Sequence, residues 1–206
     1  MRIIVNQKNF KKALGVVEKV VAKNTTLPIL NNILFKTENG RLRLSATNLE
    51  IGINYIIGAK TEEVGQVAVP ARIISDFVGN VSDEKMTLTV KNNVLSINSE
   101  HYKTQILGFD AKDFPIIPKI KSKPLVTIPI KALRNSLMSV IESVALSEAR
   151  PELAGIFVSF DNDRIVFAST DSFRLTENQF DFKNSTKQSF IIPRNTVLEL
   201  ARIAGE

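Results

Sequence analysis

Four lysines near the start of the chain have the spacing of one helix face. They are Lys8, Lys12, Lys19 and Lys23. Drawn at about 100° per residue, they fall within about 60° of one another, and the apolar residues between Phe10 and Val21 fall on the opposite side. Ammonium groups without interleaved aromatic side chains suit contacts with the phosphates of duplex DNA, which are tolerant of geometry and blind to sequence. An ordinary solvated lysine face is the alternative.

Two arginines could add positive charge to this surface. Arg72 and Arg194 each follow a proline at the expected start of a helix, where the helix N-terminus also favours phosphate. The charge is concentrated in the first part of the chain. Residues 1–123 hold 18 basic and 11 acidic side chains, a net charge of +7, whereas residues 124–206 hold 9 and 10, a net charge of −1.

Few residues are available for catalysis. The chain has no cysteine and one histidine, His101, which has no serine or cysteine beside it to act as a nucleophile. Asp161 and Asp163 could chelate a hard cation, but their spacing is also that of a hairpin turn, which we favour. No phosphate-binding loop or dinucleotide fingerprint is present. We therefore expect no catalytic residue, no metal site and no cofactor.

The elements that position these residues come in two copies. Pairing each residue with the one 123 positions later aligns Pro28 with Pro151 and Pro70 with Pro193 without a gap, and the turns at 38–40 and 161–163 also coincide. The proline- and lysine-rich stretch 114–124 between the copies is typical of an extended linker. We expect two domains, 1–123 and 124–206.

Periodicity predicts the same order of elements in each copy. In the first we expect strands at 2–5, 32–37, 41–47, 51–57, 66–69, 86–90, 94–98 and 102–107, and helices at 7–22, capped by Asn6, and 71–80. In the second we expect strands at 126–128, 155–160, 164–169, 174–180 and 189–192, and helices at 130–145 and 194–204. No apolar run approaches the length of a membrane span, and we expect a cytoplasmic protein.

The segment 170–175 differs between the copies and has two interpretations. Thr170 and Asp171 can simply turn the chain into a strand, which the pattern favours. Exposed Phe173 and Leu175, with Leu153 and with Arg174 at the rim, could instead line a small apolar pocket for a peptide.

Several short motifs together resemble one family. In the printed sequence they are TLPILNNIL at 26–34, ATNLE at 46–50, VPAR at 69–72, DFP at 113–115, TDSFRL at 170–175 and IPR at 192–194. In order and over nearly the whole chain, they are similar to the bacterial DNA polymerase III beta subunits, the sliding clamps.

The resemblance implies an α+β fold of repeated DNA-clamp domains, each with two helices packed on antiparallel sheet, with the helices lining a central DNA channel. It implies a homodimeric ring with three domains per subunit, so that residues 1–123 are the N-terminal domain, 124–206 an incomplete central domain, and the third domain is absent. The implied function is that of a non-catalytic processivity factor that encircles duplex DNA and tethers the replicative polymerase during replication.

The resemblance also implies site residues. Arg72, Arg150 and Arg194 match positions that face DNA and would join the four lysines. A pocket for short linear motifs of polymerase and clamp-loader subunits would be formed by Leu153, Thr170, Ser172, Phe173, Arg174 and Leu175. Thr104 and Ile106, on the last strand of the first copy, match the edge that joins a neighbouring subunit.

Two alternatives from other classes remain open at this point. A free-standing, non-specific basic DNA-binding protein derived from a truncated clamp would bind open linear DNA with a steep salt dependence. A hydrolase using His101 or the aspartates is the more remote alternative. We also expect that missing strands leave the second domain with an unpaired sheet edge, so that it associates or partly unfolds.

Overall fold

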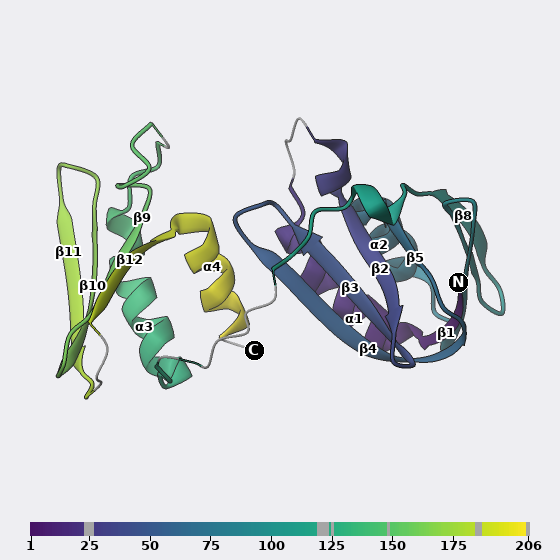
Figure 1. Cartoon of the computed structure of the whole chain (residues 1–206), viewed down its shortest axis with the longest axis horizontal. Coiled ribbons are helices and arrows are strands. Elements are labelled where there is room, and N and C mark those ends of the chain that lie inside the picture. The colour runs from purple at the N-terminus through teal and green to yellow at the C-terminus, as the bar shows by residue number, and fades with distance from the viewer. Residues whose placement is uncertain (23–26, 119–123, 125, 148, 184–186, 205–206) are drawn as a thin grey trace. The chain divides into compact units, whose positions relative to one another are not determined.

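A computed structural model describes the chain except residues 23–26, 119–123, 125, 148, 184–186 and 205–206 (Figure 1). The chain divides into two compact units, Met1–Lys119 and Ile120–Glu206. Each combines antiparallel strands with two main helices, as expected for the α+β class. Within the described residues, no helix is both long and apolar enough to cross a membrane.

The first unit is built on an eight-stranded sheet. Its strands are β1 (Arg2–Asn6), β2 (Asn32–Glu38), β3 (Arg41–Thr47), β4 (Gly52–Glu63), β5 (Gln66–Pro70), β6 (Lys85–Lys91), β7 (Val94–Asn98) and β8 (Lys103–Leu107), in the order β5-β2-β3-β4-β1-β6-β7-β8. Every pairing is antiparallel. The sheet nearly closes on itself, because the N–H of Phe109, just after β8, donates to the carbonyl of Ala68 in β5 at 2.8 Å.

Strand β4 joins the two halves of this sheet. Its residues Gly52 to Gly58 pair with β3, and those from Ala59 to Glu63 pair with β1. The expected strand at 51–57 covers only the first of these stretches. The strand is longer because both of its edges find partners, each along a different part of its length.

Two helices, α1 (Gln7–Val17) and α2 (Ala71–Asn80), pack against the first sheet (Figure 1). Phe10 of α1 meets Phe35 of β2 edge to face, with ring centroids 5.6 Å apart, in a core that also holds Leu14 and Ile74. Asn6 caps α1 as predicted, since its Oδ1 accepts the N–H of Asn9 at 3.2 Å.

The expected helix 7–22 is too long at its C-terminal end. A 3-10 turn, η1 (Glu18–Val20), follows α1, and Val21 is already extended. Val16, Val17, Val20 and Val21 are β-branched, which disfavours a continued α-helix. The tighter turn still places Val20 in the interior, where it is 2% exposed.

The second unit holds a four-stranded antiparallel sheet with the order β11-β10-β9-β12. Its elements are α3 (Ile130–Val140), the 3-10 turn η4 (Ile141–Ser143), β9 (Gly155–Phe160), β10 (Arg164–Thr170), β11 (Leu175–Asp181), β12 (Gln188–Pro193) and α4 (Arg194–Ile203). α3 is again shorter than its expected range of 130–145, because a 3-10 turn follows it. Leu137 and Val140 of α3 and Val197 of α4 pack with Ile156 and Phe167 of the sheet.

The expected strand at 126–128 does not form. Its counterpart β1 is held between β6 and the second half of β4. Among the described residues of the second unit, β11 ends at Asp181 and pairs only with β10. The counterparts of β6, 123 positions later, fall past Glu206. Among the described residues, no strand pairs with the segment 126–128 in the way that β4 and β6 pair with β1.

Candidate functional site

The lysine face predicted from the sequence lies on α1 and η1. Lys8 and Lys12 are exposed on α1, Lys19 is exposed on η1, and Lys23 lies outside the described residues. Phe10 and Leu14, on the opposite face of α1, are buried. Across the part of the chain that the structure describes, no ion pair joins Lys8, Lys12 or Lys19 to an acidic side chain. Their charges are therefore available to an anionic partner.

Lys11 shares this helix but has a different role. Its Nζ donates to the carbonyl of Gly79, at the C-terminal end of α2, at 2.9 Å. Gln7 acts beside it, because its Nε2 donates at 2.9 Å to each of the carbonyls of Val78 and Val81. These donors satisfy carbonyls that the end of α2 would otherwise leave unpaired. On α1, the charges of Lys8 and Lys12 are thus available to a partner, whereas Lys11 links α1 to α2.

Arg72 lies in the first turn of α2, with its side chain 91% exposed. Its Nε is 3.9 Å from Oδ2 of Asp76, a loose pair that solvent screens. Arg72 also lines a cavity of about 570 Å³ together with Glu18, Val21 and Ala22. The fold thus brings Arg72 next to the segment that follows Lys19.

Arg150 and Arg194 meet the same short segment in the second unit. Arg150 is exposed, and its carbonyl accepts the N–H of Leu153 at 3.0 Å. Arg194 is half-buried at the start of α4, and its N–H donates to the carbonyl of Ala154 at 3.0 Å. Its Nε is buried and has no hydrogen-bond partner among the described residues. The two arginines therefore contact residues 153–154 through their backbones.

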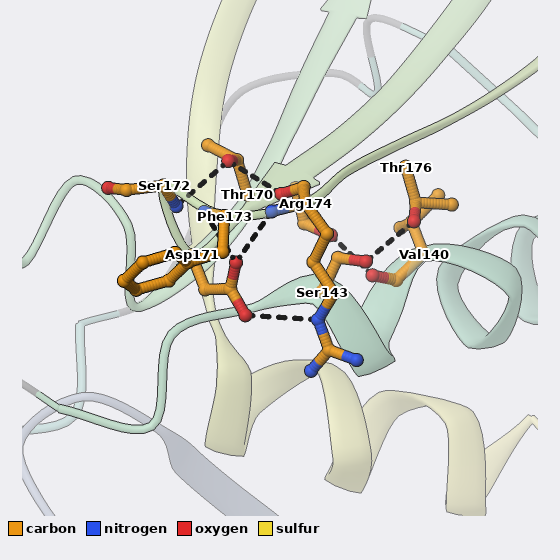
Figure 2. Close-up of polar contacts among 9 residues, drawn as sticks. Val140, Ser143, Thr170, Asp171, Ser172, Phe173, Arg174 and Thr176 are labelled. Carbon is orange, nitrogen blue, oxygen red and sulfur yellow. Dashed lines mark hydrogen bonds and ion pairs between the residues drawn. The ribbon is translucent and has the colours of Figure 1, made fainter.

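Residues 170–174 form a closed turn between β10 and β11 (Figure 2). Thr170 Oγ1 donates to the carbonyl of Arg174 at 2.8 Å and accepts the N–H of Ser172 at 3.1 Å. Asp171 Oδ1 accepts the N–H groups of Phe173 and Arg174, each at 3.0 Å, and Asp171 Oδ2 accepts from Arg174 Nε at 3.0 Å. The N–H groups of Arg174 and Phe173, in that order, hold the pKa of Asp171 below its usual range.

The first unit contains the same turn at the matching place. Thr47 Oγ1 donates to the carbonyl of Ile51 at 2.8 Å, and Asn48 Oδ1 accepts the N–H groups of Glu50 and Ile51 at 3.0 and 2.8 Å. The third residue of each turn has a left-handed backbone, with φ of 75° at Leu49 and 76° at Ser172. The interpretation of Thr170 and Asp171 as turn residues is confirmed.

The two turns differ in several side chains, and the fourth position shows a change from an acidic to an aromatic residue. Phe173 is 98% exposed where the first unit has Glu50, and Leu175 is 71% exposed, whereas Leu153 is half-buried. In Figure 2 the Phe173 ring points away from the pair formed by Ser143 and Thr176. The turn therefore presents an aromatic ring to solvent beside the Arg174–Asp171 pair.

Serine and threonine hydroxyls that the sequence did not indicate tie the two strands on either side of this turn to the segment at the end of α3. Ser143 Oγ and Thr176 Oγ1 lie 2.6 Å apart, joining η4 to β11 (Figure 2). Ser169 Oγ also donates to the carbonyl of Val140. Ser169 and Ser143 are each 4% exposed. Alternation along a strand could have marked Ser169 as inward-facing, but nothing in the sequence pointed to its partner.

The last strand of the first sheet, β8, carries the two remaining predicted residues. β8 pairs with β7 on one side and forms a sheet edge on the other. Ile106 is 4% exposed and belongs to the core, Thr104 is half-buried, and Leu107 is 74% exposed. The side chain of Ile106 therefore serves its own unit, and β8 presents its backbone and its outward side chains at this edge.

The two candidate aspartates and His101 belong to different units of the chain. Asp161 and Asp163 lie in the β9–β10 hairpin turn, where the N–H of Asp161 donates to the carbonyl of Arg164 at 3.0 Å. His101 instead meets Asp83, with its Nδ1 2.8 Å from Asp83 Oδ1. Hydrogen bonds from Ser99 and then His101 lower the pKa of Asp83 to about 2, and the bond with Asp83 raises the pKa of His101.

Comparisons with known proteins point in one direction. Residues 1–118 match the family model of the DNA polymerase III beta subunit, N-terminal domain, and residues 127–206 match that of its central domain. A beta sliding clamp of Synechocystis sp. is 28% identical over 184 residues, which cover 85% of this chain and 47% of that protein. The clamp of Buchnera aphidicola is 29% identical over 206 residues, or 98% and 56%.

Solved structures agree with these matches. A putative DNA polymerase III beta subunit from Eubacterium rectale superposes with a TM-score of 0.93 at 26% identity, covering 99% of this chain and 56% of that one. A DnaN sliding clamp from Bartonella birtlesii, bound to griselimycin, gives 0.91 at 29% identity, covering 100% and 57%. The chain spans about half the length of the curated relatives it matches. With both of its units matched in order, the chain belongs to the family of bacterial DNA polymerase III beta subunits.

Proposed function

We propose that the protein works as a sliding-clamp subunit, a non-catalytic processivity factor that encircles duplex DNA and tethers the replicative polymerase during replication in the bacterial cytoplasm. The observation that carries the proposal is the match of the two units, in order, to the N-terminal and central domains of the beta subunit. On this proposal residues 1–123 and 124–206 are its first and second clamp domains, and the ring is a homodimer.

The DNA-facing surface in this proposal is basic and tolerant of sequence. It comprises Lys8, Lys12, Lys19, Lys23, Arg72, Arg150 and Arg194. The exposure of Lys8, Lys12 and Lys19 and their lack of ion pairs among the described residues support it. Such side chains contact phosphates without reading bases, which suits a ring that must move along any sequence.

Retention on circular and linear DNA tests the proposed function. The protein, with its clamp loader and ATP, is placed on nicked circular duplex, which is then linearised. A clamp is retained on the circle and lost when the ends open, because topology rather than affinity holds it. Retention after linearisation, with an affinity that falls steeply with salt, would overturn the proposal and favour a free-standing basic DNA-binding protein.

We further propose that Leu153, Thr170, Ser172, Phe173, Arg174 and Leu175 receive short linear motifs of polymerase and clamp-loader subunits. The exposed Phe173 and Leu175, beside the Arg174–Asp171 pair, support this assignment. Griselimycin, the ligand of the Bartonella birtlesii relative, is a suitable probe. Phe173→Ala should weaken its binding, and Glu50→Ala, at the matching position of the other turn, should not. Equal binding by all three proteins would remove Phe173 from the pocket.

The edge strand β8 is proposed as the part of the subunit interface that lies within this chain. Thr104 and Ile106 were assigned to it by resemblance, and the burial of Ile106 means that it would contribute through its backbone. Leu107, 74% exposed on the same strand, is the outward side chain to change. Leu107→Lys should weaken dimer formation by the full ring-forming protein in sedimentation, and an unchanged dimer would move the interface elsewhere.

A further inference from the structure

One cluster of potential metal ligands lies outside the surfaces described above. Asp83 is in the loop between α2 and β6, and Glu100 and His101 are in the turn between β7 and β8. Each offers one ligand atom, and these atoms all lie within 4.8 Å of one another. The cluster joins two loops that are 18 residues apart in the sequence.

The central carboxylate is positioned before any ligand arrives. The side chain of Asp83 is 9% exposed. Its Oδ2 accepts the backbone N–H of His101 at 2.9 Å, and its Oδ1 lies 2.8 Å from His101 Nδ1. Asp83 therefore has little freedom to turn away, whereas Glu100 and the imidazole of His101 are exposed and can adjust.

The charge of the cluster favours a cation. Among the described residues the one ion-pair partner of Asp83 is His101, and no ion pair joins Glu100 to a basic side chain. With a neutral imidazole the cluster holds two carboxylate charges that no lysine or arginine pairs with. A nearly buried carboxylate in this position gains from a divalent ion.

The ligand types indicate which ion. One imidazole nitrogen with two carboxylate oxygens suits zinc and related transition metals, whereas magnesium and calcium prefer oxygen alone. Ligands about 2.0–2.2 Å from a tetrahedral zinc lie about 3.3–3.6 Å from each other, so the Asp83 and His101 ligand atoms, now 2.8 Å apart, would move apart by less than about 1 Å. We propose that Asp83, Glu100 and His101 form a binding site for a zinc-type divalent ion, completed by water. The ion coordinates Nδ1 of His101, and any proton held there leaves to solvent.

The test is a zinc titration of the untagged chain at neutral pH, monitored by calorimetry and by the NMR signals of the imidazole. The chain has one histidine and no cysteine, so the imidazole signal reports a single residue. We expect one zinc per chain and a shifted His101 resonance. His101→Gln and Glu100→Gln, both at exposed positions, should each weaken binding by about tenfold or more. Asp161→Asn, a carboxylate in a hairpin turn, is the matched control and should bind as the parent does.

Three results would overturn the site. The first is no zinc binding at millimolar concentration, and the second is unchanged binding by His101→Gln. The third is loss with His101→Gln but none with Glu100→Gln, which would mean a lone surface imidazole. Because Asp83→Asn also replaces one of the two oxygens that bind His101, that variant is interpreted only with a thermal melt beside it. The site lies in the first unit alone and does not depend on the clamp function.

Discussion

Lys11 and Arg134 occupy equivalent positions in the two repeats and make similar contacts, with acceptors that differ by one position in the repeat. Lys11 Nζ donates to the carbonyl of Gly79 at 2.9 Å, and Arg134 Nε donates to the carbonyl of Ala201 at 3.1 Å. In each unit a cation on the first helix thus binds the C-terminal end of the second, where the helix dipole is negative. Both units thus link their two helices through this position, with lysine in the first and arginine in the second.

Neighbouring lysines on α1 should therefore respond differently to the same substitution. Lys12→Met removes a free cation, so it should weaken binding to duplex DNA and lower the salt slope by about one, with little change in stability. Lys11→Met should lower the free energy of unfolding by about 0.5–1 kcal/mol and affect DNA binding less. Fluorescence anisotropy over a salt series and urea melts measure the two effects. If both variants lost DNA affinity equally with stability unchanged, the division of roles on α1 would be wrong.

Gln7 should contribute more to stability than the exposed residues of its helix. It is 7% exposed and donates to two carbonyls at the end of α2. Gln7→Met keeps the length of the side chain but leaves both carbonyls without this donor, which should cost about 1–3 kcal/mol in a urea melt. Asn9→Met, at an exposed position of the same helix, is the control and should stay close to the parent protein. A Gln7 variant as stable as that control would contradict the assignment.

The turn at 170–174 should open in acid. The pKa of Asp171 is lowered by the N–H groups of Arg174 and Phe173, so the ionised side chain stabilises the turn. This contribution is fully present above the unfolded pKa of about 3.9 and is lost as the pH falls through the lower folded pKa. The amide signals of Phe173 and Arg174, followed by NMR from pH 6 downward, should move with a midpoint below that of a free aspartate. A midpoint at or above it would show that the turn does not favour the carboxylate.

Glycine at the left-handed position of each turn should remove steric strain. Ser172 has φ of 76° and Leu49 has φ of 75°. Glycine adopts this conformation without the steric cost of a Cβ, of about 1–2 kcal/mol, although it loses more entropy on folding. Leu49→Gly and Ser172→Gly should therefore be neutral or stabilising by up to about 1 kcal/mol, whereas Glu50→Gly, next in the turn, should destabilise. Thermal melts of the three variants decide this, and a clear loss at Leu49 and Ser172 would contradict it.

Local signals in the sequence were sufficient for much of the fold. Asn39 and Gly40, with φ of 50° and 72°, form the tight hairpin turn that their types predict, and α2 spans the expected 71–80. The strand expected at 126–128 does not form, because a strand needs a neighbouring strand to satisfy its backbone hydrogen bonds, and such partners are set by distant residues. The ends of α1 and α3 were predicted too late, because a 3-10 turn follows each helix, and β-branched valines disfavour a longer α1.

The residues of the candidate surfaces were likewise predictable only where local spacing determines their position. The exposure of Lys8 and Lys12 followed from helix periodicity alone. The different role of Lys11 did not, because its acceptor is 68 residues away. The contact between Asp83 and His101 could not be predicted from the sequence either, because the sheet brings their two loops together.

In the repeated turn, folding constrains the fourth residue only through its backbone, so its side chain is free to serve recognition. At its fourth residue the turn uses only the backbone N–H, which Asp171 accepts from Phe173 and Asn48 accepts from Glu50. Folding therefore places no demand on that side chain, and an acidic and an aromatic residue serve equally well. Position 173 is accordingly a place where a duplicated domain can acquire a new specificity without a cost in stability, and where a designer can exchange one binding preference for another.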